Sequence, residues 1–276
     1  MKNINKLVLL FILITACSET VPPSNDNFVV EGFLTANASV NNIKVKMTSP
    51  VDAQGVTNEA ITNAQVMLTK DGSTYLLDYD PNTERYIYIG TDLDINTGEE
   101  VGLEVNAGGR RASATTLVPE APTGLALSGD ELNIPQLQLN FLLADRIGEL
   151  FEEERLTLSW SAVEGRKYFV VIENKVEQLD PILPSEIPAQ ATELLQSFRF
   201  ISEPSETPEF EIIGIALETY GKHVAKVFTV NEEYAELFDN LEQDSRDLNE
   251  PPSNVLNALG VFTAFAVDSL EFEVRR

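Results

Sequence analysis

The chain has 276 residues, with 44 acidic against 19 basic side chains and a formal net charge of −25 at pH 7. A surface this acidic repels nucleic acid and anionic lipid headgroups, so we expect no nucleic-acid partner, while a cationic ligand or a basic partner is compatible with it. One cysteine and one histidine exclude an internal disulfide and are too few for a zinc site.

The chain begins with an apolar run from Leu7 to Ala16, preceded by Lys2 and Lys6 and followed by Cys17. A bilayer span needs about 20 apolar residues, so this run is too short to be one. A positive start, a short apolar run and small residues before a cleavage site are typical of a secretory signal peptide.

The sequence at the cleavage site, Ile14-Thr15-Ala16-Cys17, fits the lipobox of bacterial lipoproteins. We therefore predict that residues 1–16 are a signal peptide and that Cys17 carries a diacylglycerol and acyl lipid, with no other cofactor. Each buried acyl CH₂ contributes about 0.8 kcal/mol, so two or three chains anchor firmly. An ordinary signal peptide with a chance cysteine is the alternative.

A polar stretch with two prolines, residues 17–27, is predicted to be a tether. From Phe28 onwards the pattern becomes that of β-strands with turn signals between them, which indicates a β-sandwich. The predicted strands cover 28–35, 40–50, a hairpin over 64–80 turned at Asp71-Gly72, 85–90, and a hairpin over 99–119 turned at Gly108-Gly109. Two prolines within 118–124 predict a linker at the end of this first domain.

A second β-rich unit follows the linker, with strands predicted within 124–147, 154–174, 210–230 and 259–274. Leu156, Leu158 and Trp160 alternate inward, and we expect Trp160 in the core rather than exposed as a ligand platform. The proline-rich stretch 178–209 predicts a long loop. The pattern over 231–245 predicts one amphipathic helix with Asn231 as its N-cap.

The chain has few side chains that could carry out catalysis. A nucleophilic triad requires a base, and the one histidine, His223, falls in a predicted strand, where we expect a polar strand position. The sequence holds no glycine-rich phosphate loop. Carboxylate pairs are expected by chance among so many acids, so we predict that the protein is not an enzyme and has no catalytic residues.

One segment bears a partial likeness to a calcium loop. Asp92, Asp94 and Asn96 have the spacing of the first three ligands, which makes them weak calcium candidates. Thr97 stands where the turn glycine is needed, and Leu103 where the bidentate glutamate should be. An acidic turn between strands is the alternative, and no metal site is predicted with these residues alone.

Five motifs in order, together with the lipobox, resemble domain of unknown function family 4249, a group of Bacteroidota outer-membrane lipoproteins. They are "FVVEGFLT" (28–35), "ITNAQVMLTKDG" (61–72), "GLEVNAGGRRASATTLVPEAP" (102–122), "AKVFTVNEEYAELFDNLEQ" (225–243) and "EPPSNVLNALGVFTAFAV" (250–267). The last resembles a pattern that Pro252, Ser253, Asn254, Gly260, Val261, Phe262 and Ala264 fit. The chain departs from the family at Ala258-Leu259, where a glycine is common, and at Val101-Gly102, where an aromatic residue is usual.

The resemblance implies an all-β fold of two sandwich domains with one amphipathic helix near the C-terminus. The first, 28–119, would be immunoglobulin-like. The second, 124–276, would resemble fibronectin type III with loop and helix insertions. The family carries no assigned activity, and its members are commonly encoded beside TonB-dependent receptors.

The function we expect is therefore a non-catalytic lipoprotein, anchored in outer-membrane lipid, that acts as an accessory binding or assembly partner of a TonB-dependent transporter. The alternatives are a stand-alone surface module that binds a glycan or peptide, with Phe198 and Phe200 as weak candidates, and a structural surface lipoprotein. Glu19, just after Cys17, is a weak signal for the cell surface, and the periplasmic face is the alternative.

Overall fold

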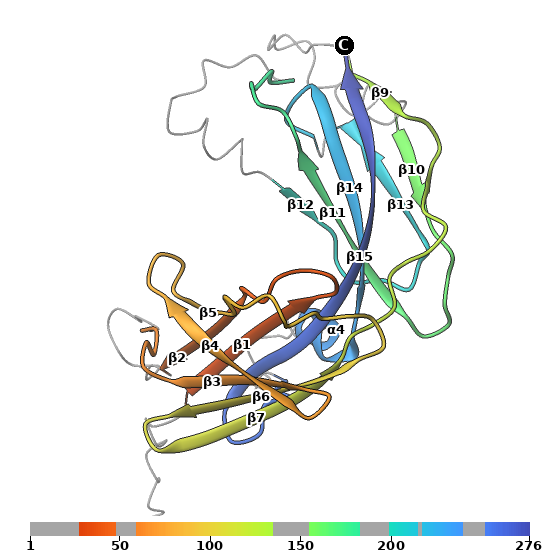
Figure 1. Ribbon diagram of the computed structural model, residues 1–276. Coiled ribbons are helices and arrows are strands. Elements are labelled where there is room, and N and C mark those ends of the chain that lie inside the picture. The colour runs from red at the N-terminus through yellow and green to blue at the C-terminus, as the bar shows by residue number, and fades with distance from the viewer. Residues whose placement is uncertain (1–27, 48–58, 135–154, 183–198, 215–216, 240–251) are drawn as a thin grey trace, which may run out of the picture.

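The computed structural model describes residues 28–47, 59–134, 155–182, 199–214, 217–239 and 252–276. These residues form two β-rich lobes (Figure 1). The strands of the first lobe are β1 (Phe28–Thr35), β2 (Ile43–Met47), β3 (Gln65–Lys70), β4 (Ser73–Asp80), β5 (Arg85–Ile87), β6 (Glu100–Ala107) and β7 (Arg110–Leu117). Those of the second lobe are β8 (Ala126–Leu127), β9 (Glu131–Asn133), β10 (Arg155–Ser159), β11 (Lys167–Asn174), β12 (Arg199–Ile201), β13 (Glu209–Ile213) and β14 (Gly221–Val230), followed by helix α4 (Glu232–Asp239) and the long strand β15 (Leu259–Arg275).

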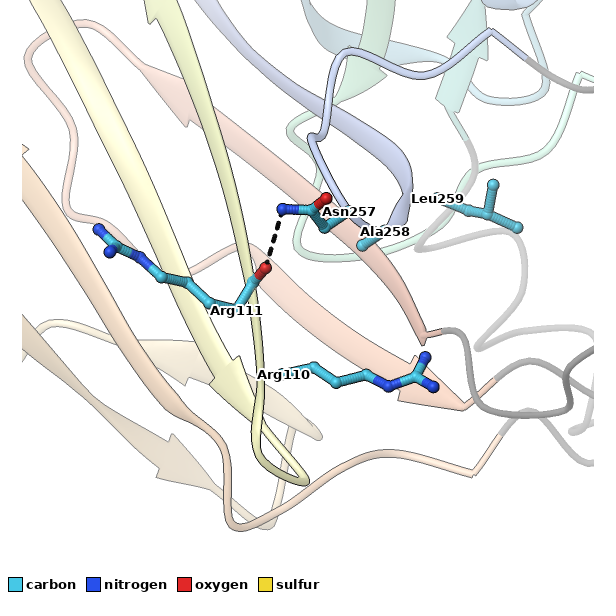
Figure 2. Close-up of a pocket in the computed structure, with 5 residues that line it drawn as sticks. All are labelled: Arg110, Arg111, Asn257, Ala258 and Leu259. Carbon is cyan, nitrogen blue, oxygen red and sulfur yellow. Dashed lines mark hydrogen bonds between the residues drawn. The ribbon is translucent and has the colours of Figure 1, made fainter.

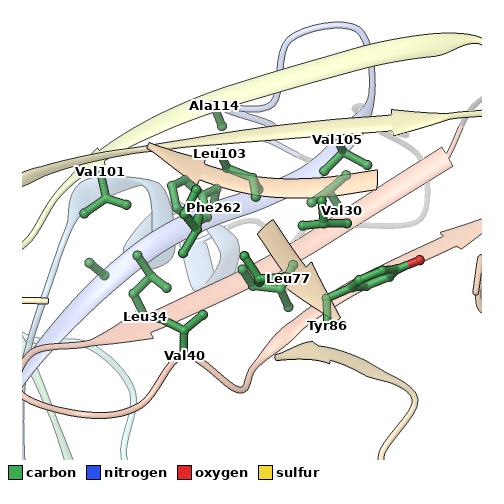
Figure 3. Packing of buried hydrophobic residues seen from close by; sticks show 14 of the residues in the cluster. Val30, Leu34, Val40, Leu77, Tyr86, Val101, Leu103, Val105, Ala114 and Phe262 are labelled. Atoms are coloured by element: carbon green, nitrogen blue, oxygen red, sulfur yellow. The ribbon is translucent and has the colours of Figure 1, made fainter. Parts of the chain in front are cut away.

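The first lobe is a sandwich of two layers. One layer has the order β15-β1-β2-β5 and the other β3-β6-β7, and β4 pairs with β3 over its first residues and with β5 over Asp78–Asp80. Alternating side chains of both layers fill the space between them, as Figure 3 shows for Val30, Leu103 and Phe262. The sandwich predicted from period-two alternation is confirmed.

The two predicted hairpin turns are confirmed in position and conformation. Asp71 and Gly72 have φ of 50° and 77°, and Gly108 and Gly109 have 58° and 79°. Two consecutive positive φ angles are what a two-residue turn needs to match the twist of its flanking strands. These turns fix the register of β3 with β4 and of β6 with β7.

The second lobe has one layer in the order β12-β11-β14-β15, with β9 also on β15, and a second layer in the order β13-β10-β8. Leu156 and Leu158 are buried between the layers, and the Trp160 ring packs edge-on against Tyr168 with 5.5 Å between centroids. Trp160 is therefore a core residue, as expected. The all-β, two-sandwich fold class is confirmed.

Strand β15 belongs to both lobes. Its first part pairs in parallel with β1, from Leu259 opposite Val29 to Phe265 opposite Thr35. Its second part pairs antiparallel with β14, from Ala266 to Val274. The predicted division at 119 and 124 therefore needs correction, because residues 259–265 complete the first sandwich. A period-two pattern marks a strand but not its partner, so the pattern could not reveal this.

The parallel pairing of β15 with β1 depends on close backbone approach. Gly260 has φ of 114°, and a Cβ there would lie 2.0 Å from the Val30 carbonyl oxygen. The Phe262 ring lies over Gly32, where a Cβ would stand 2.7 Å from the ring. Asn254 adds two hydrogen bonds: its Oδ1 accepts from the Phe262 N–H at 2.9 Å, and its Nδ2 donates to the Phe262 carbonyl at 2.7 Å.

An aromatic cluster joins the lobes, and we call its five rings the junction cluster: Phe33, Phe169, Phe228, Tyr234 and Phe265. Phe33 stacks on Phe265 at 6.1 Å, and Phe169 stacks on Phe228 at 4.7 Å. Tyr234 of α4 meets Phe265 edge to face at 4.8 Å. Such pairs contribute about 0.5–1.5 kcal/mol each beyond the area they bury. The cluster therefore holds the two sandwiches against each other.

The predicted helix begins where expected and its described part ends at Asp239. Asn231 plays a role that its N-cap position did not reveal: its Nδ2 donates to Thr116 Oγ1 at 3.0 Å and to the Leu117 carbonyl at 2.8 Å. Both acceptors are on β7, so the start of the helix is tied to the first lobe. Within the described ranges, no helix is long and apolar enough to cross a bilayer.

Candidate functional site

The β6–β7 hairpin places a basic side chain between two hollows of the surface. Arg110 follows the Gly108-Gly109 turn and lines both hollows, of about 510 and 400 Å³. Figure 2 shows its side chain extending on the side where Leu259 lies, and the Arg111 side chain extending the opposite way. Neighbouring strand residues point to opposite faces. Of the two arginines, Arg110 therefore directs its guanidinium towards the hollows, and Arg111 directs its guanidinium away from them.

The first hollow forms where the segment before β15 packs on the edge of β7. Ser113 and Leu256 exchange two backbone hydrogen bonds, of 2.8 and 3.2 Å, and Asn257 Nδ2 donates to the Arg111 carbonyl at 3.3 Å. Ala258 and Leu259 then turn away into β15 and leave the hollow beside Arg110.

The second hollow is more apolar and lies where the described chain begins. Phe28, Met47 and Ile61 line it together with Arg110. Met47 is 40% exposed although its strand neighbours Val45 and Ile43 are buried. An exposed sulfur-containing side chain next to a guanidinium gives this end of the lobe an amphipathic character.

The Arg111 guanidinium forms an ion pair with Glu104 of β6. A hydrogen bond from Asn106, together with that ion pair, lowers the pKa of the Glu104 carboxyl. Arg111 is 68% exposed, so the pair adds little stability, but it leaves the face opposite the hollows locally neutral.

A lysine lies within the loop that holds the calcium candidates. Lys70 Nζ is 2.7 Å from Glu99 Oε2 and also donates to the Asp94 carbonyl. The hydrogen bond between the Lys70 ammonium group and the Glu99 carboxylate raises the pKa of Lys70 and lowers that of Glu99. An ammonium group therefore stands beside oxygens that a bound cation would use.

The three calcium candidates are not brought together. Asp92 accepts a hydrogen bond from the Tyr88 hydroxyl, which raises the pKa of Tyr88 to about 12. Asn96 Nδ2 donates to Glu99 Oε1 at 3.2 Å, and the Asn96 N–H to Glu99 Oε2 at 2.7 Å. Among the residues that the structure describes, no group of three or more His, Cys, Asp or Glu side chains is placed to hold a metal ion.

The structure describes one of the other three predicted site residues. Cys17 and Phe198 lie outside the described residues. Phe200, a weak candidate for glycan or peptide binding, is half-buried and packs on Phe210 with 5.6 Å between centroids. Sequence alone did not reveal this, because Phe198 and Phe200 beside a proline-rich stretch give too short an alternation to place their face.

His223 is buried rather than in the polar strand position we expected. Only 3% of it is exposed, its ring stacks on Phe272 at 5.4 Å, and its Nδ1 lies 3.0 Å from the Gly221 carbonyl. Burial lowers its pKa, so the imidazole stays neutral. A buried ring between apolar neighbours has no access to a substrate.

Arg110 was not singled out by its sequence pattern, which indicated only a hairpin turn. The available signal was two arginines directly after that turn in a very acidic chain. What could not be predicted is that residues 257–259, almost 150 positions later, complete the hollow beside it.

These observations define the class of protein first: it is an all-β protein of two β-sandwiches. The chain belongs to the family described as domain of unknown function DUF4249, whose family model matches residues 17–271. The family resemblance expected from the five motifs is thereby confirmed. A search of curated proteins finds no match.

The solved structures that this chain matches are distant from it. A segment of two fibronectin type III domains from chicken tenascin has 10% identity and a TM-score of 0.24, over 90% of this chain and 99% of that one. The structure of a bacterial ice-binding adhesin has 10% identity and a TM-score of 0.22, over 90% of this chain and 64% of that one. Family membership therefore rests on the family model.

Proposed function

We propose that this protein is a non-catalytic lipoprotein, anchored in outer-membrane lipid through Cys17, that acts as an accessory binding or assembly partner of a TonB-dependent transporter. The lipobox, Ile14 to Cys17, supports the anchor. The match to a family of unknown function over residues 17–271 is compatible with the proposal. The cell-surface face is part of it, with the periplasmic face as the alternative.

The observation that carries the proposal is that the two sandwiches are held as one body. Strand β15 runs through both lobes, and the junction cluster packs between them. A rigid body presents its surfaces in a fixed relation, which lowers the entropy lost when a large partner binds. Such a design suits assembly with another protein better than it suits the closing motions by which many enzymes work.

The chemical groups support a binding role as well. The described carboxylates with lowered pKa are paired with basic or amide groups, as Glu99 is with Lys70 and Glu173 with Lys226. His223 is buried. The glycan- or peptide-binding alternative has weaker support, because Phe200 packs inward.

Co-purification tests the proposal. A tagged full-length chain is expressed in its own host, and outer membranes are solubilised in mild detergent. We expect a transporter to be recovered with the wild-type chain, and none with Cys17→Ser, which cannot be lipidated. Repeated recovery of the wild-type chain alone would refute the partnership, and protease shaving of intact cells separates the two membrane faces.

A further inference from the structure

A third hollow of the surface lies at the end of the first lobe where β15 passes on to the second lobe. It encloses about 370 Å³ between the turn after β1, residues 37–40, and residues within 88–96, after β5. The Ala36 N–H donates to the Phe265 carbonyl of β15 at 2.8 Å, which places the turn beside the crossing strand. Ligand sites are frequent where domains meet, and the volume is within the roughly 300–1,000 Å³ of small-molecule sites.

Backbone hydrogen bonds hold the walls of this hollow in place. The Asn37 N–H donates to the Ile95 carbonyl at 2.7 Å, and the Tyr88 N–H donates to the Val40 carbonyl at 2.8 Å. Val40 and Ile95 also line the hollow and are buried, so the two walls share packed apolar contacts beneath their polar surface. A site that is already formed loses less conformational entropy when a ligand binds.

Three contacts fix the Tyr88 ring, which is half-buried in the wall of the hollow. Its hydroxyl donates to Asp92, and its ring meets the Tyr75 ring edge to face with 5.5 Å between centroids. Gly90 lets the ring lie close to the backbone, since a Cβ there would stand 2.6 Å from Tyr88 Cε1. A ring held in this way offers a ligand apolar surface without a further loss of side-chain freedom.

The polar side chains of the hollow are available to a ligand. Asn37, Ser39, Thr91 and Asp94 line it and are exposed. Within the part of the chain that the structure describes, none of these four side chains has a hydrogen-bond or ion-pair partner. An amide and two hydroxyl groups can both donate and accept, and a carboxylate accepts only. The hollow therefore combines donors and acceptors with one negative charge.

This combination selects one class of small molecule. Asp94 and the net charge of −25 repel an anion. The Lys70 ammonium group beside the Asp94 carbonyl disfavours a metal ion. An apolar ligand would leave the polar groups of the hollow without partners. A sugar has hydroxyl groups that donate to a carboxylate and exchange hydrogen bonds with an amide, and its C–H groups pack on an aromatic ring.

We propose that this hollow binds a short neutral carbohydrate, with the Asp94 carboxylate and the Asn37 amide bound to its hydroxyl groups and the Tyr88 ring packed against it. The site is in the first lobe, apart from Phe200 in the second. The inference goes beyond the proposed function, because carbohydrate binding here needs neither the lipid anchor nor a transporter. It adds capture of a ligand to the assembly role.

Saturation-transfer NMR tests the site. The mature chain, residues 17–276, is prepared with Cys17→Ser, so that no lipid is attached and no sugar-based detergent is needed. Glucose, galactose, mannose, N-acetylglucosamine, maltose and cellobiose are each added at millimolar concentration, with glucuronate and putrescine as charged comparison ligands. We expect saturation to pass from the protein to at least one neutral saccharide, whose dissociation constant is then measured by titration.

Two variants test the polar groups. Asn37 has φ of 59°, which glycine adopts without strain, so Asn37→Gly removes the amide and keeps the turn. It should weaken binding roughly threefold, and Asp94→Ala roughly tenfold or more, since hydrogen bonds to a charged group are stronger. The matched controls are Asn257→Gly, at φ of 63° beside the first hollow, and Asp78→Ala, on the exposed side of β4. Both controls should bind the saccharide as the wild type does.

The test of the ring is Gly90→Ala, whose added methyl group displaces Tyr88 from its place over the backbone. It should weaken saccharide binding, whereas Gly72→Ala, at a turn with open space around it, should not. Circular dichroism spectra that match the wild type show that each variant is folded.

Two results would overturn the inference. Saturation of none of the neutral saccharides, or tighter binding of glucuronate or putrescine than of all of them, excludes a carbohydrate site. Binding that is unchanged in both Asn37→Gly and Asp94→Ala excludes this hollow. Either failure leaves the co-purification of a transporter with the lipidated chain unaffected, and recovery of that chain alone leaves carbohydrate binding unaffected, so the two proposals fail separately.

Discussion

At Gly260 two backbones approach so closely that no side chain fits. The φ of 114° disfavours any other residue, and a Cβ would meet the Val30 carbonyl oxygen at 2.0 Å. We expect Gly260→Ala to lower the free energy of unfolding by roughly 3 kcal/mol or more, because strand β1 or β15 must shift. Chemical denaturation measures the change.

The matched control is Gly165→Ala. Gly165 also has a positive φ, 71°, but open space around it. Its substitution should cost only about 1–2 kcal/mol, the conformational penalty alone. Equal losses at the two positions would show that the close approach of β15 to β1 contributes nothing.

His223 should make stability depend on pH. Burial lowers its pKa from the usual 6.5, so the folded chain keeps the imidazole neutral while the unfolded chain takes up a proton below that pH. Its contribution is therefore fully present above pH 6.5 and is lost as the pH falls towards the folded-state pKa. The residues opposite it, Asn174 and Phe272, carry no charge.

Denaturation of wild type and His223→Gln measures this effect. Between pH 7 and about pH 5 the wild type should lose stability more steeply than the variant, because the variant cannot bind that proton. Parallel curves for the two proteins would mean that His223 does not titrate differently on folding.

Calcium should find no ready site in the loop around Asp92 and Asp94. The Lys70 ammonium group already lies beside the Asp94 carbonyl and Glu99, and repels a second cation. Calorimetric titration with millimolar calcium should give the same heat for the wild type as for Asp92→Asn/Asp94→Asn. Extra heat in the wild type would establish binding at these carboxylates.

At the scale of elements, residues 252–258, which precede β15 and which we call the clasp, bind the first lobe by hydrogen bonds. Asn254 holds Phe262 by two hydrogen bonds, and Leu256 pairs with Ser113 on β7. With the Asn231 amide on Leu117, these contacts cover much of the outer edge of β7. A covered edge is protected from pairing with other chains.

Removing the Asn254 amide should weaken this clasp. Asn254→Ala leaves the Phe262 N–H and carbonyl without these partners and should cost roughly 1–3 kcal/mol by thermal or chemical denaturation. Asn106→Ala is the comparison, since its amide donates to the Glu104 carboxylate on the surface of the sheet. A loss at Asn254 no larger than at Asn106 would contradict the role of the clasp.

Local patterns predicted the elements well and their distant partners poorly. Asp71-Gly72 and Gly108-Gly109 are read from a few neighbouring residues, and both turns are where the pattern put them. The pairing of β15 with β1 joins residues more than 200 positions apart, and alternation of apolar residues is the same whichever strand lies alongside. The hollow beside Arg110 depends on that pairing, so it was equally hidden.

At the scale of the whole molecule, the shared strand couples the stability of the two lobes. Each sandwich loses a strand of one layer if β15 leaves, and Phe265 packs in the junction cluster between them. We expect one calorimetric unfolding transition, with equal calorimetric and van't Hoff enthalpies, for the mature chain. Two resolved transitions in the wild type would contradict this coupling.

Loosening the junction should uncouple the lobes in part. Phe265→Ala removes contacts to Phe33, Phe169, Phe228 and Tyr234, and large-to-small changes of this kind cost about 3–5 kcal/mol. The transition should broaden or split. Phe200→Ala, confined to the core of the second lobe, should lower the transition temperature without splitting it.

The shared strand also governs when the chain can fold during its synthesis. The ribosome makes β1 more than 200 residues before β15, yet the first sandwich needs β15 beside β1. A growing chain therefore cannot close its first lobe, even after every other strand of that lobe has emerged. Contacts this distant in sequence also slow folding after release. The first lobe would thus remain incomplete until β15 has been made.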